Sequence, residues 1–392
     1  METSAPELEK NHSPLLLKKI ETIPDFLAIR DRWEGLLSQS GSESIFLTWE
    51  WVYNWWLVYR EKRELFIVTV ENACGDLLGI APLLSRKIRL PAGNLNLLEF
   101  LGTGEKRKDE VCSEFLDFIA PKGREEEVMK AIFDYLLNNT SRWDILNLQS
   151  LLNNANILKH ISGKKNKKLL FWKASNNGRG YNYLDFPEGE CADINFRKKR
   201  FQKTLKNILK HGEVRARLCD SEASLAEDMR SLIRLHQLRW NSAGRPGCFS
   251  SLKFNEFHQR LARHLLLKGR LALQLLEVND EAVACEYCFE YNRRLFIYQS
   301  GFNPRLYKNA SLGHLSMAYL MEGALARGIK KAEFLRGEEA YKEKWSKDKR
   351  LAFNIVIARK NLKGIIYIAI RTAFENMKQL GKGIARKIRK VK

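Results

Sequence analysis

The sequence has no apolar run long enough to cross a membrane. Its apolar stretches, such as residues 365–370, are far shorter than the ~20 residues that a membrane-spanning helix needs. Residues 1–11 carry three glutamates and no apolar segment, which is the opposite of a secretory signal. We therefore expect a cytoplasmic protein.

Cysteine is also scarce and gives no disulfide framework. The seven cysteines are irregularly spaced, and in the cytoplasm we expect them to be reduced thiols. Cys285 and Cys288 form a C-x-x-C pair inside an apolar, strand-like run, where a spacing of three residues places their side chains on opposite faces. No second Cys or His pair follows at zinc-site spacing. We expect neither a metal nor a redox site.

Positive charge is abundant but unevenly placed. The formal net charge is +21, yet residues 1–150 hold 18 basic and 24 acidic side chains. The positive excess lies in four later segments, residues 159–180, 195–217, 327–350 and 361–392. A basic second half predicts an anionic partner there. Nucleotide phosphates, RNA, anionic lipid and a polysaccharide precursor all fit this charge.

The expected helices and strands occur in the same order twice. Apolar residues at helical spacing predict amphipathic helices, and short apolar runs between turn residues predict strands. In the first half the expected strands are 15–20, 65–70, 77–84, 95–101, 112–120 and 143–148, and the helices are 24–40, 48–60 and 123–138. In the second half the strands are 213–219, 271–278, 282–291, 294–302, 332–335 and 351–358, and the helices are 222–240, 254–268, 312–327 and 340–346. Such a repeat indicates a duplicated fold.

The repeat divides the chain into two lobes. Residues 15–190 form the first lobe and 213–360 the second, joined by a basic connecting helix at 191–212. We expect residues 1–14 to be disordered and 159–180 to form an exposed loop and hairpin. Residues 361–392 alternate isoleucines with Lys and Arg, a pattern typical of a helix on an anionic membrane surface. The same pattern fits a segment that docks on the lobes and ends in a solvated tail.

Four motifs carry a resemblance to a known family. Three lie in the second half: Tyr298-Gln-Ser-Gly-Phe-Asn-Pro304, Ser311-Leu-Gly-His-Leu315, and Glu-Phe-Leu-Arg-Gly-Glu-Glu-Ala-Tyr-Lys-Glu-Lys-Trp at 333–345. The fourth, Leu78-Gly-Ile-Ala-Pro-Leu83, lies in the first half. Together they resemble the BioF2-like acetyltransferase domain of the GNAT superfamily, which includes CelD-type proteins of cellulose and exopolysaccharide gene clusters. That family is itself similar to the FemAB aminoacyltransferases.

The resemblance spans roughly residues 15–360, with three departures. The family usually has an acidic residue at the position of Asn303, a proline at that of Leu312 and an aspartate at that of Glu333. The first departure argues against carboxylate chemistry at position 303. The other two are conservative for shape.

The resemblance implies an α+β fold of two tandem GNAT-like lobes, each a mixed, mainly antiparallel sheet flanked by helices. It implies an acyl-CoA-dependent N- or O-acyltransferase, with acetyl-CoA or another acyl-CoA as donor and an amine- or hydroxyl-bearing acceptor such as a glycan precursor. We expect the transfer site in the second lobe, because the first lobe is acidic and lacks a Tyr-Lys-x-x-Trp segment. The first lobe would then be supporting.

The expected helix 312–327 offers a seat for the donor. A helix N-terminus has free backbone N–H groups and the positive end of the helix dipole, which suit a pyrophosphate. An ordinary capped helix remains the alternative. The residues predicted to bind the donor are Arg305, Lys308, Ser311, Gly313, Ser300 and Gly301.

Two residues are candidates for the chemistry. The resemblance implies that Tyr341 protonates the departing thiolate, and core packing beside Trp345 is the alternative. Glu286 is the candidate base, because burial in an apolar strand raises the pKa of a carboxyl group. An ion pair with Arg239 or Arg336 is its alternative. The residues predicted to bind substrate are Gln299, Glu338, Lys342 and Trp345.

Two other functions stay open. A FemAB-like enzyme would transfer an amino acid from aminoacyl-tRNA, and the basic second half would then bind RNA. A non-catalytic protein would use the duplicated fold as a scaffold in a polysaccharide synthesis complex. An acyltransferase would act in exopolysaccharide or cell-envelope glycan synthesis, in the cytoplasm or at the inner face of the membrane.

Overall fold

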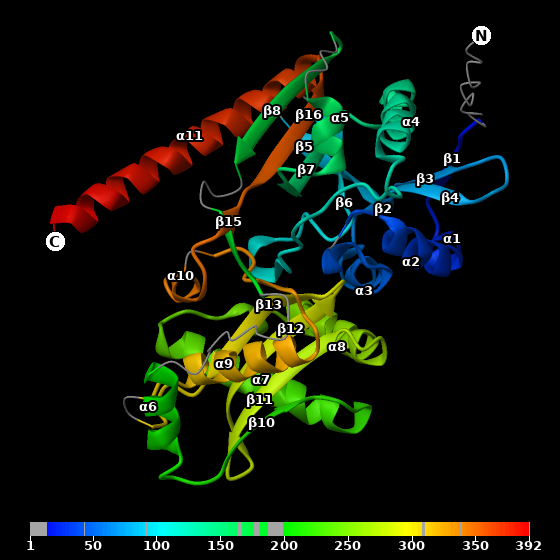
Figure 1. Cartoon of the computed structure of the whole chain (residues 1–392). Helices are drawn as coiled ribbons and strands as arrows, with labels where there is room; N and C mark the ends of the chain where they lie inside the picture. The colour runs from blue at the N-terminus through cyan, green and yellow to red at the C-terminus, as the bar shows by residue number, and fades with distance from the viewer. Residues whose placement is uncertain are drawn as a thin grey trace, which may run out of the picture.

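The protein contains two large sheets, one in each lobe. The computed structural model describes residues 14–391, apart from 43, 91–92, 163–166, 176–179, 187–198, 308–309 and 338. Figure 1 shows one sheet above the other, each with helices on its faces. Both sheets are mixed and mainly antiparallel, so the predicted fold class is confirmed. No helix in the described residues is long and apolar enough to cross a membrane.

The first half follows the expected order of elements, with one helix broken. The helix expected at 24–40 is interrupted at Ile29, whose φ of −91° and ψ of 1° leave the helical region. The elements are β1 (Leu16–Ile20), α1 (Ile23–Ala28), α2 (Arg30–Gln39), α3 (Trp49–Tyr59), β2 (Glu64–Leu65), β3 (Ile67–Glu71), β4 (Leu77–Ala81), β5 (Leu83–Leu90), β6 (Gly93–Phe100), α4 (Glu125–Asn138), β7 (Ile145–Leu152), α5 (Asn156–Ile161), β8 (Leu169–Ser175) and β9 (Tyr181–Asp185).

The second half repeats this order. The connecting helix is α6, which buries Phe201 and Ile208 in the same core as the residues of α9. The elements are α6 (Lys199–Ile208), β10 (Val214–Leu218), α7 (Glu222–Ser242), α8 (Leu252–Leu267), β11 (Leu271–Val278), β12 (Glu281–Tyr291), β13 (Arg294–Phe302), α9 (Leu312–Ala326), β14 (Lys331–Glu333), α10 (Lys342–Trp345), β15 (Lys349–Arg350), β16 (Ala352–Arg359) and α11 (Leu362–Val391).

Two segments differ from the sequence prediction. Residues 112–120 were expected to form a strand, but they form none, because Cys112 and Phe115 adopt positive φ angles of 55° and 54° that break an extended run. The segment 159–180 was expected to be an exposed loop and hairpin. Its described part instead contains the end of α5 and strand β8.

The two lobes exchange strands. The first sheet has the order β2-β5-β6-β7-β16-β8, and the second has β10-β11-β12-β13-β14-β9-β15. Strand 351–358 was expected to end the second lobe, yet β16 pairs antiparallel with β7 on one side and β8 on the other. Figure 1 shows β16, in orange, among the strands of the upper lobe. Strand β9 in turn occupies the place beside β14.

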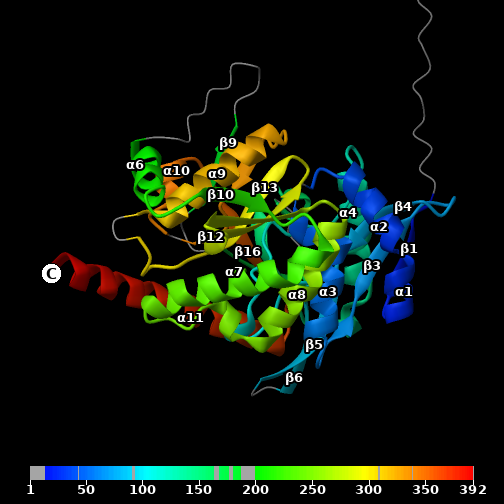
Figure 2. The same cartoon turned by 90° about the horizontal axis from the view of Figure 1, so that it is seen from below.

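Helices cover both faces of the second sheet. Cys285 of β12 lies in the core that contains residues of α7 and α8, whereas Cys288 lies in the core beneath α9. The prediction that the C-x-x-C pair points to opposite faces is therefore confirmed. Figure 2 shows α9 and α7 on opposite sides of the sheet.

Helices α3 and α8 form the main helical contact between the lobes. Helix α3 is apolar on most of its surface, as expected of a helix enclosed on several sides. Its Trp51 packs edge-on against Phe257 of α8, with ring centroids 5.1 Å apart. At the edge of this contact, Arg270 donates to Glu34 at 2.7 Å and to Glu50 at 3.1 Å. Aromatic packing and buried ion pairs thus join the lobes.

We predict that Val356→Ala destabilises the first sheet, although the residue comes from the second half of the chain. Val356 is buried among Leu95, Leu97 and Ile145. Its truncation should lower the free energy of unfolding by about 2 kcal/mol and raise amide hydrogen exchange in β6 and β7. Leu351→Ala, at a 45% exposed position, is the control. Equal loss of protection in β11 and β12 would contradict the strand exchange.

Candidate active site

A cavity opens where two parallel strands of the second sheet separate. Strands β13 and β14 pair in parallel only from Arg294↔Lys331 to Phe296↔Glu333. A bulge follows directly on β13, where the register with β12 shifts and leaves Tyr298 as the extra residue. Beyond this point a cavity of about 320 Å³ lies between β13, the start of α9 and the segment after β14. We call it the second-lobe cavity.

The cavity unites residues that are far apart in the sequence. Glu286 comes from β12, Ser300 from β13, and Ser311 and Gly313 from the start of α9. Tyr341 and Trp345 come from the second half of the motif at 333–345. Six of the predicted site residues therefore line one cavity: Glu286, Ser300, Ser311, Gly313, Tyr341 and Trp345.

One end of the cavity is electropositive. The N-terminus of α9 faces it, and the first turn of this helix has no acidic residue. Arg239 and Lys344 also line the cavity, and neither forms an ion pair within the described part of the chain. Arg239 is held by hydrogen bonds from its guanidinium to Ser300, at 2.6 Å to Oγ and 3.2 Å to the carbonyl oxygen. This end can bind an anion.

The corresponding helix of the first lobe has the opposite charge. Helix α4 connects the parallel strands β6 and β7 as α9 connects β13 and β14. Its first turn contains Glu125, Glu126 and Glu127. Three carboxylates would repel a phosphate group at the helix N-terminus. Of these two helices, only α9 offers an anion site.

Two acidic side chains, Glu286 and Tyr341, also line the cavity. Glu286 is 1% exposed, and burial raises the pKa of its carboxyl to about 8, although the nearby positive charge of Arg239 opposes this shift. Its Oε2 has no hydrogen-bond partner. Burial, and then the charge of Glu286, raise the pKa of the Tyr341 hydroxyl. Tyr341 is therefore protonated at neutral pH and can act as a proton donor.

Comparison with known proteins identifies this part of the chain. Residues 195–343 match the family model described as an acetyltransferase (GNAT) domain. These residues form a GNAT-type acyltransferase domain. The match covers most of the second lobe, including all elements that surround the cavity up to Lys342. The protein is therefore an acyltransferase.

Solved structures share the fold of almost the whole chain. FemX matches with a TM-score of 0.58 and 9% identity, over 86% of this chain and 96% of that one. A conserved protein of unknown function from Bacteroides thetaiotaomicron matches with a TM-score of 0.54 and 9% identity, over 88% and 100%. L-PGS from Bacillus licheniformis matches with a TM-score of 0.50 and 12% identity, over 91% and 98%. At these identities the likeness concerns the fold. No curated protein sequence matches the chain.

Several predicted residues of the GNAT domain lie away from the cavity. The side chain of Gln299 forms a hydrogen bond with the side chain of His236 on α7. Gly301 packs so closely on α7 that a Cβ added there would lie 2.4 Å from the backbone nitrogen of His236. Strand alternation explains this, because Ser300 and Phe302 occupy the cavity face. Arg305 is exposed outside the cavity. Lys308 and Glu338 lie outside the described residues.

Lys342 is buried and bonded within the protein instead of facing the cavity. It is 4% exposed, and its ammonium donates to the carbonyl oxygens of Arg336 at 2.7 Å and Leu335 at 3.2 Å. Its charge is also paired with Glu339. Lys342 thereby holds the segment between β14 and Tyr341 in a fixed fold.

Four polar or aromatic residues that line the cavity were not among the predicted site residues: Arg239, Phe302, His314 and Lys344. Phe302, His314 and Lys344 stand inside the motifs that carry the family resemblance, so their positions gave a usable signal. Arg239 lies on α7, far from those motifs. Its side chain reaches the cavity only through the packing of α7 on β13.

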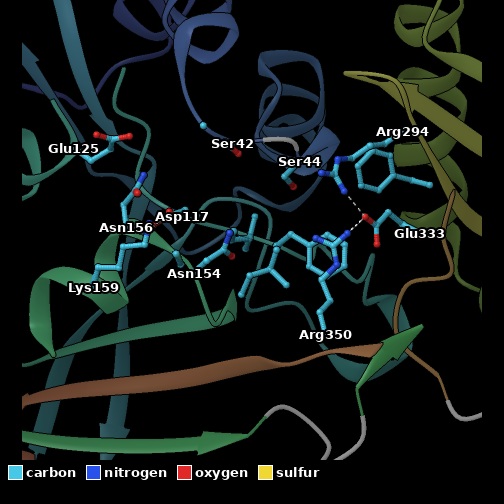
Figure 3. A pocket seen from close by; sticks show the side chains of 16 residues that line it. Ser42, Ser44, Asp117, Glu125, Asn154, Asn156, Lys159, Arg294, Glu333 and Arg350 are labelled. Carbon is cyan, nitrogen blue, oxygen red and sulfur yellow. Dashed lines mark hydrogen bonds and ion pairs between the residues drawn. The ribbon is translucent and has the colours of Figure 1, made fainter. Parts of the chain in front are cut away.

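A smaller cavity of about 140 Å³ lies between the lobes (Figure 3). There Glu333 forms ion pairs with both Arg294 and Arg350. Burial lowers the pKa of each arginine to about 10, so both remain charged at neutral pH. Among the described residues, no cluster of three His, Cys, Asp or Glu side chains could hold a metal ion. These ion pairs of Glu333 with Arg294 and Arg350 fix the last parallel residue pair of β13 and β14, Phe296↔Glu333.

We predict that Glu286→Gln changes how stability depends on pH. The folded-state pKa of about 8 exceeds the ordinary value of 4.5, so the folded state keeps a proton that the unfolded chain has lost between these values. Wild-type stability should therefore fall as pH rises through this range, by at most about 1.4 kcal/mol per pH unit from this group. Denaturant unfolding at pH 5 and pH 8 should show a smaller fall for Glu286→Gln.

Glu281→Gln, on an exposed position of the same strand, is the matched control. It should keep the wild-type pH dependence. An unchanged pH dependence in Glu286→Gln would mean that the carboxyl is not protonated in the folded protein at neutral pH.

Proposed function

We propose that this protein transfers an acyl group, most simply an acetyl group, from acyl-CoA to an amine or hydroxyl. The observation that carries the proposal is the second-lobe cavity, which combines the start of α9, Tyr341 and two cations that have no ion-pair partner among the described residues. A pyrophosphate fits the helix start, with Arg239 and Lys344 supplying charge. The acyl chain would then lie along β13, whose edge is unpaired with β14 beyond Phe296.

The proposed reaction needs few covalent helpers. The acceptor nitrogen or oxygen attacks the thioester carbonyl, a bond to carbon forms, and the carbon–sulfur bond breaks. The acceptor loses one proton and the CoA thiolate gains one, so the protons balance. Tyr341 is the proposed donor to the thiolate, because its protonated hydroxyl lines the same cavity as the start of α9. Glu286 is the proposed base in its ionised form, and its protonated form would have to lose a proton first.

The other predicted binding residues differ in whether their positions support a role. Ser311 and Gly313 are proposed to contact the donor, because they begin α9 and line the cavity. Trp345 is proposed to bind substrate beside His314, whose ring centroid lies 4.9 Å away. Arg305, Gln299, Gly301 and Lys342 have no such support from their positions.

The BioF2-like and CelD-type resemblance suggests a glycan precursor as acceptor, in exopolysaccharide or cell-envelope synthesis. The fold shared with FemX supports the alternative of transfer from aminoacyl-tRNA. A scaffold without catalysis is the third possibility, but the buried acids and unpaired cations in one cavity favour an enzyme.

We predict that acetyl-CoA raises the melting temperature of the protein, because it would bind the folded state alone. Arg239→Gln should weaken this binding at least about tenfold, since it removes a charge from the cavity. Tyr341→Phe should retain binding but lower release of free CoA thiol, measured with a panel of amines, by about 100-fold. Calorimetry and a thiol assay measure the two effects.

Arg245→Gln is the control, because Arg245 lies at the end of α7 outside the cavity. A melting temperature unaffected by acetyl-CoA and by longer acyl-CoAs would refute the proposed donor. A shift with aminoacyl-tRNA alone, steeply dependent on salt, would support the FemAB-like alternative.

We also propose that α11 contacts an anionic membrane surface. The segment 361–392 is strongly basic. Its large apolar side chains are exposed although the first part of the helix packs on the lobe: Leu362 (68%), Ile365 (51%), Ile370 (51%), Phe374 (59%) and Met377 (63%). Figure 1 shows α11, in red, running along the first lobe to the C-terminus at the edge of the molecule. An exposed apolar row on a basic helix suits a lipid interface.

We predict that the protein co-sediments with vesicles containing about one third phosphatidylglycerol, and much less with phosphatidylcholine alone. The double change Phe374→Asp and Met377→Asp should lower the bound fraction several-fold, because it places charge on the apolar row. Leu252→Asp is the matched control, since Leu252 is an 86% exposed leucine on α8. Equal binding of the double variant would count against membrane contact by α11.

A further inference from the structure

The first lobe has a cavity at the position that corresponds to the second-lobe cavity. Strands β6 and β7 pair in parallel only from Leu97↔Ile145 to Glu99↔Asn147, and then separate. Beyond them lies a cavity of about 310 Å³, which we call the first-lobe cavity. Apart from Cys112, Tyr367 and two glycines, every residue that lines it has a charged, amide or hydroxyl side chain. Such a lining is costly to enclose unless its groups are satisfied.

Some of these polar groups are satisfied within the protein. Arg86 donates to Glu99 through two nitrogens, and the Asn147 amide also donates to Glu99 at 2.9 Å. The oxygen of the Asn147 amide has no hydrogen-bond partner in the part of the chain that the structure describes, although the residue is only 2% exposed. The Nε of Arg371 is likewise buried without a partner. A donor and an acceptor are therefore left for a bound molecule.

Two cations line the cavity without a carboxylate partner among the described residues, Lys106 and Arg371, and Lys106 is exposed. Arg371 is the one whose Nε is buried. It lies on α11, beside Tyr367, and its guanidinium stacks 5.2 Å from the ring centroid of Trp172. It forms no ion pair with a carboxylate in the described part of the chain. Burial also raises the pKa of Glu105 in the same cavity to about 7, which reduces negative charge there at neutral pH. The cavity therefore favours an anionic group next to Arg371.

The first-lobe cavity is connected to β13 and to the segment after β14 through residues 110–114. The guanidinium of Arg336, which follows β14, pairs with Glu110 at 2.9 Å, and both residues line the cavity. The Arg336 backbone N–H donates to Glu114 at 3.0 Å. Tyr298, the bulged residue of β13, donates its hydroxyl proton to the Val111 carbonyl oxygen. One segment, residues 110–114, thus connects the first-lobe cavity to β13 and to the chain that carries Tyr341.

We propose that the first-lobe cavity binds the acyl acceptor, and that this acceptor carries a phosphate or carboxylate group beside its amine or hydroxyl. The proposal rests on the proposed function. The anionic group of this molecule contacts Arg371. The amide oxygen of Asn147 accepts a hydrogen bond from an N–H or O–H group of the same molecule. The nucleophile then points past Arg336 toward the separation of β13 and β14. A soluble molecule and a lipid headgroup both supply this chemistry.

The experiment uses small probes that contain an amine with or without an anionic group. O-phosphoethanolamine and β-alanine carry the anion, and ethanolamine lacks it. Isothermal titration calorimetry on the full-length protein should detect binding of at least one anionic probe and none of ethanolamine. Arg371→Gln should weaken that binding about tenfold or more, and Arg371→Lys should recover part of it.

Two variants serve as controls. Lys363→Gln removes the same charge from α11 but at a position outside the cavity, so it should leave probe binding unchanged. Arg239→Gln should weaken acetyl-CoA binding and leave probe binding intact, and Arg371→Gln should do the reverse. Retained acetyl-CoA affinity in Arg371→Gln also demonstrates that the variant is folded.

The outcomes separate this proposal from the proposed function. Absence of acetyl-CoA binding in the wild type refutes the donor but leaves the probe result standing. No binding of either anionic probe, or equal binding by Arg371→Gln, overturns the acceptor site. Loss of probe binding in Arg239→Gln alone would assign the probe to the donor cavity and also overturn it. Acetyl transfer to phosphatidylethanolamine vesicles but not to O-phosphoethanolamine supports the site with a lipid as its source.

Discussion

The short parallel pairing of two strands in each sheet is the constraint on which both cavities depend. In each lobe the parallel strands share only three residue pairs before they separate. In the second lobe the last pair is fixed by Glu333 between Arg294 and Arg350. Two residues later, Leu335 adopts a positive φ of 53°, which turns the chain away from β13. A longer ladder at this point would close the space that Tyr341 and Ser300 now line.

The same topology serves two different electrostatic purposes. In both lobes a helix returns from the first parallel strand to the second, so its N-terminus lies near the separation. Helix α9 begins without an acidic residue, whereas α4 begins with three glutamates. Since the dipole of a helix attracts anions only where its first turn is not already negative, the fold alone does not decide which lobe can bind a phosphate. The residues of the first turn decide it.

Local sequence patterns predicted most of the elements and their repeat, because apolar spacing and turn residues act over short distances, whereas the fold class was implied by the family resemblance. They predicted the cavity in part, since Ser311, Gly313 and Tyr341 lie in motifs next to predictable element ends. They could not predict which sheet β16 joins, because a strand with so many buried residues could pair on both sides in either sheet. Nor could they give Arg239, which reaches the site through helix packing.

The set of predicted site residues could have been narrowed from the sequence on physical grounds. Strand alternation alone separates Ser300 from Gln299 and Gly301, so these three residues could not all face one ligand. Lys342 is different. A lysine in a segment rich in charged residues suggests a free charge, and only the fold reveals that two backbone carbonyl oxygens and Glu339 surround its ammonium.

The strand exchange gives the two cavities a common framework. The chain leaves the second-lobe cavity after Trp345, passes through β15 beside β9, and enters the first sheet as β16, between β7 and β8. It then forms α11, whose Tyr367 and Arg371 line the first-lobe cavity. Fewer than 40 residues therefore carry Arg336, Tyr341 and Arg371 in succession. Because β15 pairs with β9 in the second sheet and β16 pairs with β7 and β8 in the first, the short link between these two strands ties the two sheets together.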